Sequence, residues 1–116
     1  MSQHHSINYL EIPVRDLAAT KTFFTHAFGW TFQDYGPEYS CFLHVGIAGG
    51  FYQVNSQFTL AKGSPLIVIY SQDLLASQAL IIAAGGEIIK PIFDFPGGQR
   101  FHFTDVNGNE YGVWSE

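Results

Sequence analysis

The stretch DLAATKTFFTHAFG, Asp16 to Gly29, is repeated in degenerate form as DLLASQALIIAAGG, Asp73 to Gly86. When the chain is compared with itself at an offset of 57 residues, six identities fall within 18 positions. The Asp that begins each stretch suits the N-cap of a helix, and the final Gly suits a left-handed C-terminal cap. Any two short amphipathic helices share such caps, but here the flanking segments repeat as well. We therefore interpret the repeat as a duplicated structural unit.

Each copy predicts a strand, a helix and three further strands, because apolar residues alternate in the strands and recur at helical spacing between them. The first copy gives a strand at 7–14, a helix at 17–28 and strands at 31–35, 40–45 and 50–54. The second copy gives a strand at 66–70, a helix at 74–84 and strands at 87–92, 99–104 and 110–114. The polar segment 55–65 joins the copies. The two prolines of segment 91–96 predict an irregular or edge segment that forms a loop over a site.

These elements predict an α+β fold with two βαβββ units in one domain covering residues 1–116. Unit one is expected at about 5–57 and unit two at about 62–116. Aromatic residues make up 16% of the chain and charged residues 13%, so apolar surface is expected to serve a pocket or a homodimer interface. A net charge of −5 argues against nucleic-acid binding, and no stretch is apolar for long enough to span a membrane. A single cysteine, Cys41, fits a reducing cytoplasm.

The segment DVNGNEYGVW, Asp105 to Trp114, predicts a tight turn at Asn107-Gly108 followed by a final strand. Gly112 lies inside that strand, where a glycine often marks a bulge or the close approach of another group.

Two segments, INYLEIPVRDLAATKTFFTHAFGW (7–30) and FHFTDVNGNEYGVW (101–114), resemble the vicinal oxygen chelate superfamily. This superfamily includes glyoxalase I, bleomycin-resistance proteins and extradiol dioxygenases. The resemblance implies two βαβββ units that curve into a U-shaped mixed sheet around a cleft, with the helices on the outer face.

Metal-dependent members of the superfamily place their ligands on the first and last strand of each unit. In this sequence the matching positions are Tyr9, Leu66, Gly112 and, with a looser alignment, the region of Gly50. Glycine and leucine offer no donor atom to a divalent metal. Glu110 lies two residues before the matching position and is set aside because it is nearer the turn. We therefore predict no metal and no cofactor.

Three other polar residues are candidates for the cleft. Glu11 is interpreted either as a general base or as a partly solvated strand residue that bonds a nearby tyrosine. His44 and His102 are interpreted as proton carriers or as structural hydrogen-bonding groups. His44 is expected to share a face with Phe42, while Cys41, Leu43 and Val45 are expected in the core. Glu11, His44 and His102 also form a possible displaced metal-ligand set.

The function predicted from these features is metal-independent binding of a small, partly apolar or aromatic molecule, for sequestration or sensing, as in bleomycin-resistance proteins. The residues expected to line the cleft are Tyr9, Glu11, His44, Tyr52, Tyr70, His102 and Trp114. The alternative is a lyase, isomerase or dioxygenase that uses a divalent metal on displaced ligands, or Glu11 as a general base. A module that mainly associates with a protein partner is a third hypothesis.

Overall fold

Each repeat folds into one βαβββ unit in the computed structural model of the chain, which describes residues 2–116. Unit one contains β1 (Leu10–Val14), α1 (Leu17–Phe28), β2 (Thr31–Asp34), β3 (Tyr39–Leu43) and β4 (Gly49–Gln53). Unit two contains β5 (Ile67–Tyr70), α2 (Leu74–Ala83), β6 (Glu87–Phe95), β7 (Gly98–Thr104) and β8 (Glu110–Ser115). A short 3-10 turn, η1 (Leu60–Lys62), lies in the segment between the units.

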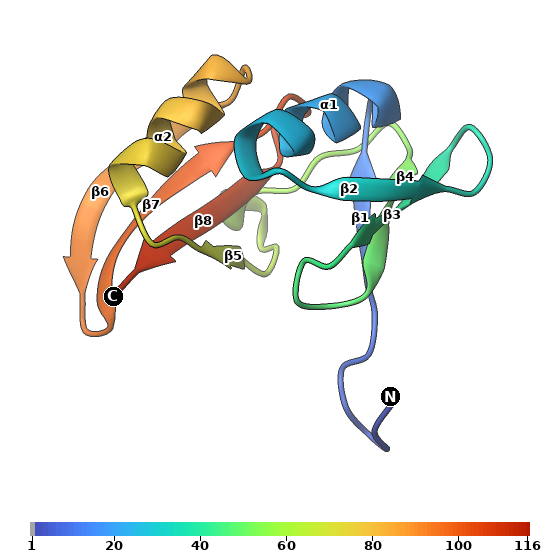
Figure 1. Cartoon of the computed structure of the whole chain (residues 1–116), viewed down its shortest axis with the longest axis horizontal. Helices are drawn as coiled ribbons and strands as arrows, with labels where there is room; N and C mark the ends of the chain where they lie inside the picture. Colours follow the sequence, from blue (N-terminus) through green and yellow to red (C-terminus); the bar gives the residue numbers. More distant parts are fainter. Residues whose placement is uncertain (1) are drawn as a thin grey trace.

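The units form two four-stranded mixed sheets with the same topology. Their strand orders are β1-β4-β3-β2 and β5-β8-β7-β6. The first and last strands of each unit pair in parallel, and the other neighbours pair antiparallel. Figure 1 shows the two sheets on either side of the molecule, with the helices packed beside each other. The predicted fold class is confirmed, and the two sheets do not close into one.

Helix α1 packs against both sheets and joins the two units into one core. The ring of Phe24 lies 5.3 Å from that of Phe51 on β4 and 5.4 Å from that of Tyr111 on β8. Phe23, one residue earlier, lies 6.0 Å from Phe103 on β7. All five rings are buried, so their apolar surface is removed from water where the units meet. The helices therefore cover one face of each sheet and leave the other face open.

The predicted helix caps are present, with one shift in unit two. The carboxylates of Asp16 and Asp73 accept hydrogen bonds from the third residue of their helices, at 3.0 and 3.1 Å. Gly29 ends α1 in the left-handed conformation, with φ of 71°. In unit two the prediction of Gly86 as the cap was wrong, because Gly85 takes the positive φ of 103°.

Gly86 has a different role, which is to let the two units approach each other. A Cβ atom at this position would lie 2.9 Å from Cε1 of Phe23 on α1 and 2.7 Å from Cγ2 of Ile81 on α2. Such distances are too short for carbon atoms in van der Waals contact. The glycine is therefore explained by packing between the units, not by the end of the helix.

Strand β6 differs most from its prediction. It runs from Glu87 to Phe95, beyond the predicted end of the strand at residue 92 and into the segment 91–96, where we expected a loop. It does lie at the edge of its sheet, where a proline is tolerated because its missing N–H faces outward. Its register with β7 shifts between Ile88 and Lys90 and again between Lys90 and Phe93. The expected irregularity is therefore present as a distorted edge strand.

The faces of β3 were also assigned incorrectly. Ser40 and Phe42 are buried toward the core, while Leu43 is exposed and Cys41 is only half-buried. The error arose because Cys and Leu are more apolar than Ser, whereas the position of Phe42 fixes the alternation.

The turn between β7 and β8 links unit two to the start of α1 in unit one. Asn107 Oδ1 accepts hydrogen bonds from the backbone N–H groups of Arg15 and Asp16, at 2.9 and 3.1 Å. Its Nδ2 atom donates to Thr20 Oγ1 at 2.8 Å and to Asp105 Oδ2 at 3.1 Å. Asn107 is buried, so these bonds satisfy polar groups that have little access to water.

A second asparagine of the same turn holds the linker. Asn109 Nδ2 donates to the carbonyl of Pro13 at 2.8 Å, and its Oδ1 accepts from the backbone N–H of Phe58 at 3.0 Å. Asp105 Oδ1 accepts from the backbone N–H groups of Asn107 and Asn109 and shapes the turn. The turn predicted at Asn107-Gly108 is thus also the polar contact between the units.

Replacing Asn107 with Ala is expected to lower the free energy of unfolding by about 2–4 kcal/mol, because it leaves two backbone N–H groups and Thr20 without their partner. Urea denaturation followed by circular dichroism measures this change. Asn55→Ala is the matched control, since Asn55 is exposed in the linker and its loss should cost less than about 0.5 kcal/mol. Equal losses in the two variants would contradict a role for Asn107 in joining the units.

Candidate functional site

The candidate site consists of the two sheet faces that no helix covers, which we call open face one and open face two. Successive residues of a strand point to opposite sides of the sheet, so every second side chain lies on an open face and the others lie in the core. Open face one surrounds Gly50 and carries the side chains of Tyr9, Glu11, Tyr39, Cys41 and Tyr52. Open face two surrounds Gly112 and carries seven side chains, which are Val68, Tyr70, Lys90, Arg100, His102, Glu110 and Trp114.

Three side chains of open face one form a hydrogen-bonded cluster. The hydroxyl of Tyr9 lies 2.5 Å from that of Tyr39 and 3.3 Å from Cys41 Sγ. Burial, together with the neighbouring Tyr9 and Glu11, raises the pKa of Tyr39 well above its usual value. The bond to Cys41 is the main cause that raises the pKa of Tyr9. Both phenols therefore stay protonated at neutral pH. One hydroxyl donates to the other, so one proton of the pair is left to donate to a ligand or to a neighbouring acceptor.

The ring of Tyr39 fills the space beside Gly50. A Cβ atom at Gly50 would lie 2.7 Å from the Tyr39 hydroxyl oxygen and 2.8 Å from the carbonyl oxygen of Ser40. No side chain fits at position 50 unless Tyr39 and the backbone of β3 move. The region that matches a carboxylate ligand in metal-dependent relatives is thus occupied by a phenol.

On open face two, His102 and Glu110 form a buried pair. His102 Nδ1 lies 3.1 Å from Glu110 Oε2, and the side chains are 3% and 10% exposed. Glu110 Oε1 accepts a hydrogen bond from the backbone N–H of Leu60 in the linker, at 2.9 Å. His102 Nε2 is buried and has no hydrogen-bond partner among residues 2–116. An imidazole whose one nitrogen is bonded to a carboxylate and whose other nitrogen is free can exchange a proton with a ligand that reaches it.

Position 112 is more open than position 50. A Cβ atom at Gly112 would lie 3.3 Å from Leu66 Cδ2 and 3.6 Å from both His102 Cδ2 and Val68 Cγ2. These atoms are the ends of side chains, which can move by a few tenths of an ångström. Gly112 therefore leaves a shallow gap that Leu66 partly fills.

The four matching positions do not fit a divalent metal. Tyr9 is engaged by Tyr39 and Cys41, and Gly50, Leu66 and Gly112 carry no donor atom. Within residues 2–116, no three His, Cys, Asp or Glu side chains are grouped so that they could hold an ion. The displaced set of Glu11, His44 and His102 is thus not assembled by the fold.

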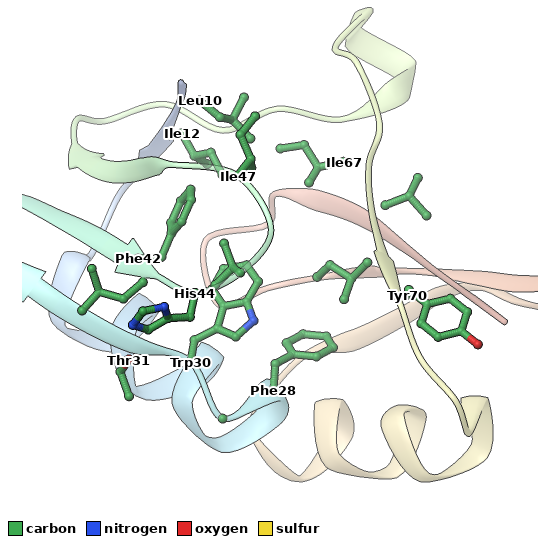
Figure 2. A pocket seen from close by; sticks show the side chains of 15 residues that line it. Leu10, Ile12, Phe28, Trp30, Thr31, Phe42, His44, Ile47, Ile67 and Tyr70 are labelled. Carbon is green, nitrogen blue, oxygen red and sulfur yellow. The ribbon is translucent and has the colours of Figure 1, made fainter. Parts of the chain in front are cut away.

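A cavity of about 600 Å³ lies between unit one and the edge strand β5. Figure 2 shows its lining, with His44 and Tyr70 at its two sides and Phe28 and Trp30 between them. His44 follows the end of β3 with a φ of 58°, a left-handed conformation that is uncommon for a residue other than glycine. Most of the remaining lining is aliphatic and comes from β1, β5 and the loop after β3.

The seven side chains predicted to line one cleft are thus divided among three places. Open face one carries Tyr9, Glu11 and Tyr52, open face two carries Tyr70, His102 and Trp114, and His44 lies at the cavity between the units. His44 and Tyr70 line the same cavity. Their part in ligand binding stays a prediction.

Tyr39, Cys41, Arg100 and Glu110 were not predicted as site residues. Tyr39 and Cys41 alternate with the buried Ser40 and Phe42, so a correct face assignment of β3 would have found them. Arg100 lies two residues before His102 and shares its face by the same alternation. Glu110 was set aside because it is nearer the turn than Gly112. In the sheet register it stands opposite Thr104, and its side chain reaches diagonally to His102, which stands opposite Gly112.

The family profile described as "Glyoxalase/Bleomycin resistance protein/Dioxygenase superfamily" matches residues 6–113, which is nearly the whole chain. The chain belongs to this superfamily. The resemblance stated from the two terminal segments is thereby confirmed.

Among curated relatives in the superfamily, "Putative glyoxylase CFP32" of Mycobacterium bovis is 28% identical over 123 residues. The protein of the same name in Mycobacterium tuberculosis has the same identity. The alignment covers 92% of this chain but only 44% of each relative, so the chain spans less than half of their length.

Solved structures of the superfamily share the fold at low identity. A glyoxalase-related enzyme from Fulvimarina pelagi has a TM-score of 0.80 at 19% identity, covering 97% of this chain and 89% of its own. The fosfomycin resistance protein FosX from Listeria monocytogenes has a TM-score of 0.79 at 18% identity, with coverage of 98% and 95%. TioX from Micromonospora has a TM-score of 0.70 at 16% identity, with coverage of 93% and 96%.

The two helices of residues 2–116 are both too short to cross a lipid bilayer.

The two glycines of the open faces predict opposite responses to the same substitution. Gly50→Ala is expected to lower the free energy of unfolding by about 1–3 kcal/mol, because the new methyl group overlaps Tyr39 and the β3 backbone. Gly112→Ala meets only side-chain atoms, at 3.3 Å or more, and we expect a change within about 1 kcal/mol. Chemical denaturation of both variants measures the difference. Gly50→Ala with Tyr39→Ala should recover part of the loss, and equal costs for the two single variants would refute this packing.

Proposed function

We propose that this protein binds a small, partly apolar or aromatic molecule without a metal, for sequestration or sensing. The observation that carries the proposal is the Tyr39 ring beside Gly50, because it replaces a metal-ligand position with a phenol that donates hydrogen bonds. Tyr52 on open face one and Tyr70 and Trp114 on open face two add aromatic surface for stacking and apolar contact. The free thiol of Cys41 is in keeping with a reducing cytoplasm.

We propose further that two copies of the chain combine to make the binding cleft. Each open face alone is half of a site, and both leave aromatic rings exposed, such as Tyr9 at 43% and Tyr70 at 47%. Strands β1 and β5 are sheet edges with unpaired backbone groups, and both line the apolar cavity between the units. A second copy that covers this cavity would place its β5 beside β1 and extend one sheet into the other. Open face one of one copy would then meet open face two of its partner.

The alternative is an enzyme that transfers protons without a metal. The buried pair of His102 and Glu110, with Nε2 of the imidazole free, favours this reading more than Glu11 does, because Glu11 is exposed. Proton transfer by a positioned imidazole is a common contribution to isomerases and lyases. Burial of the pair beneath its neighbours means that a substrate would have to displace side chains to reach Nε2. We therefore keep binding as the main proposal.

Protein purified without a chelator is expected to contain well under one equivalent of Zn, Ni, Fe, Mn or Co by elemental analysis. EDTA should leave its melting temperature unchanged, while a bound aromatic compound at 100 times its dissociation constant should add about 2.7 kcal/mol of stability. Stoichiometric metal that is lost on Glu11→Ala or His44→Ala would overturn the metal-free proposal. Turnover of methylglyoxal with a thiol would overturn sequestration in favour of an enzyme.

A mixing experiment tests whether two copies share each cleft. Tyr52→Ala damages open face one and Trp114→Ala damages open face two, so each variant alone should lose binding of the best ligand from a thermal-shift screen. After joint unfolding and refolding, random pairing of copies should restore about a quarter of the sites, because one cleft of each mixed dimer is intact. The double variant refolded in the same way is the control. No recovery in a mixture that does form mixed dimers would show that each site lies within one chain.

A further inference from the structure

Arg100 on open face two is a cation held in place by aromatic rings. Its guanidinium carbon lies 5.2 Å from the ring centroid of Phe93 and 5.2 Å from that of Phe95, both on the edge strand β6. In the sheet register Arg100 stands opposite Phe93 on one side and Trp114 on the other. Contacts with ring faces fix a guanidinium without neutralising its charge.

No carboxylate pairs with this guanidinium. Within residues 2–116 the two ion pairs join Lys21 to Asp34 and His102 to Glu110, and Arg100 takes part in neither. The nearby Asp94 accepts a hydrogen bond from Gln99. Arg100 Nε is buried and has no hydrogen-bond partner among the same residues.

The other charged groups of this region do not compete for the site. Lys90 lies over the ring of Phe93, 4.3 Å from its centroid, and adds a second positive charge to the open face. Glu116 accepts a hydrogen bond from the hydroxyl of Tyr70 at 3.3 Å. The chain has five Lys and Arg residues against ten Asp and Glu, so two unpaired cations on one face stand out from an acidic background.

Arg100 also lines a pocket of suitable size for a small molecule. The pocket has a volume of about 290 Å³, and its walls are Val68, Phe95, Gly97 and Trp114 together with Arg100. The wall opposite the guanidinium is thus mainly apolar and aromatic. An anion alone would leave this wall unused, and a neutral aromatic molecule would leave the guanidinium without a partner.

We infer that this pocket takes a small organic anion with an apolar or aromatic body, such as an aromatic carboxylate or phosphonate. The anionic group binds the guanidinium of Arg100, in a charge-assisted and bidentate manner, and the body lies against Trp114 and Phe95. This inference rests on the proposed binding function and names the chemical class of its ligand. Nothing in the pocket distinguishes a carboxylate from a phosphonate, so both belong to the test.

The test compares benzoate, phenylphosphonate, neutral benzamide and inorganic phosphate by isothermal titration with the full chain. Benzoate or phenylphosphonate should bind at least about tenfold more tightly than benzamide, because only they form the charge-assisted pair. Arg100→Gln should remove this preference and leave benzamide binding unchanged. Arg100→Lys should keep part of the preference, since it retains the charge but loses the planar fork. Arg15→Gln is the matched control, because Arg15 is an exposed arginine of unit one and does not line the pocket of Arg100.

The outcomes separate this inference from the proposed function. Equal binding of benzoate and benzamide, or an equal effect of Arg15→Gln and Arg100→Gln, overturns the anion site while binding of small molecules stands. If phosphate binds as tightly as phenylphosphonate, the claim that the aromatic wall contributes to affinity is wrong. If none of the four probes binds and a screen of neutral aromatic compounds also fails, both the inference and the proposed function fall. An unfolding curve for Arg100→Gln that matches the unsubstituted chain confirms that the variant is folded.

Discussion

The buried hydrogen bonds of the β7–β8 turn are the constraint on which the arrangement of the two units depends. Asn107 reaches from unit two to the backbone at the start of α1, and Asn109 reaches to Pro13 and to the linker. Both side chains are buried, and a polar group without a partner is costly there, so few relative positions of the units satisfy them. Apolar packing around α1 stabilises the contact between the units, but it is not directional. The hydrogen bonds of the two asparagine amides are directional, and they specify one orientation of unit two relative to unit one.

The fold could be predicted well from the sequence because the same pattern of strands, helix and caps occurs in both copies of the repeat. The caps at Asp16 and Asp73 and the turn at Asn107 depend on near neighbours, and such signals can be read from one chain. The assembly of the site could not be read in this way. The place of Tyr39 depends on the absence of a side chain at Gly50, eleven residues away, and the pairing of His102 with Glu110 depends on strand register. A resemblance to metal-dependent proteins shows where ligands would stand, but it does not show what fills those places.

The two open faces have different chemistry although they derive from the same repeat. Open face one is a set of protonated phenols beside a thiol, and it offers hydrogen-bond donors without a formal positive charge. Open face two combines the cations Lys90 and Arg100 with Trp114 and a buried imidazole. A molecule bound between them would meet phenols, a thiol and the carboxylate of Glu11 on one side and a surface with two cations on the other. This difference between duplicated halves is consistent with a scaffold on which function resides in the site and not in the fold.

The unequal space at the two open-face glycines also limits the order in which metal ligands could be introduced at these positions. At position 112 an added Cβ meets only side-chain atoms of Leu66, Val68 and His102, at 3.3 Å or more, so a substitution there does not require the loss of another side chain. At position 50 the ring of Tyr39 has to be lost first, because a new side chain and the ring overlap. A metal ligand at position 50 therefore requires a second substitution at Tyr39, and that substitution removes the phenol cluster before any ligand is gained.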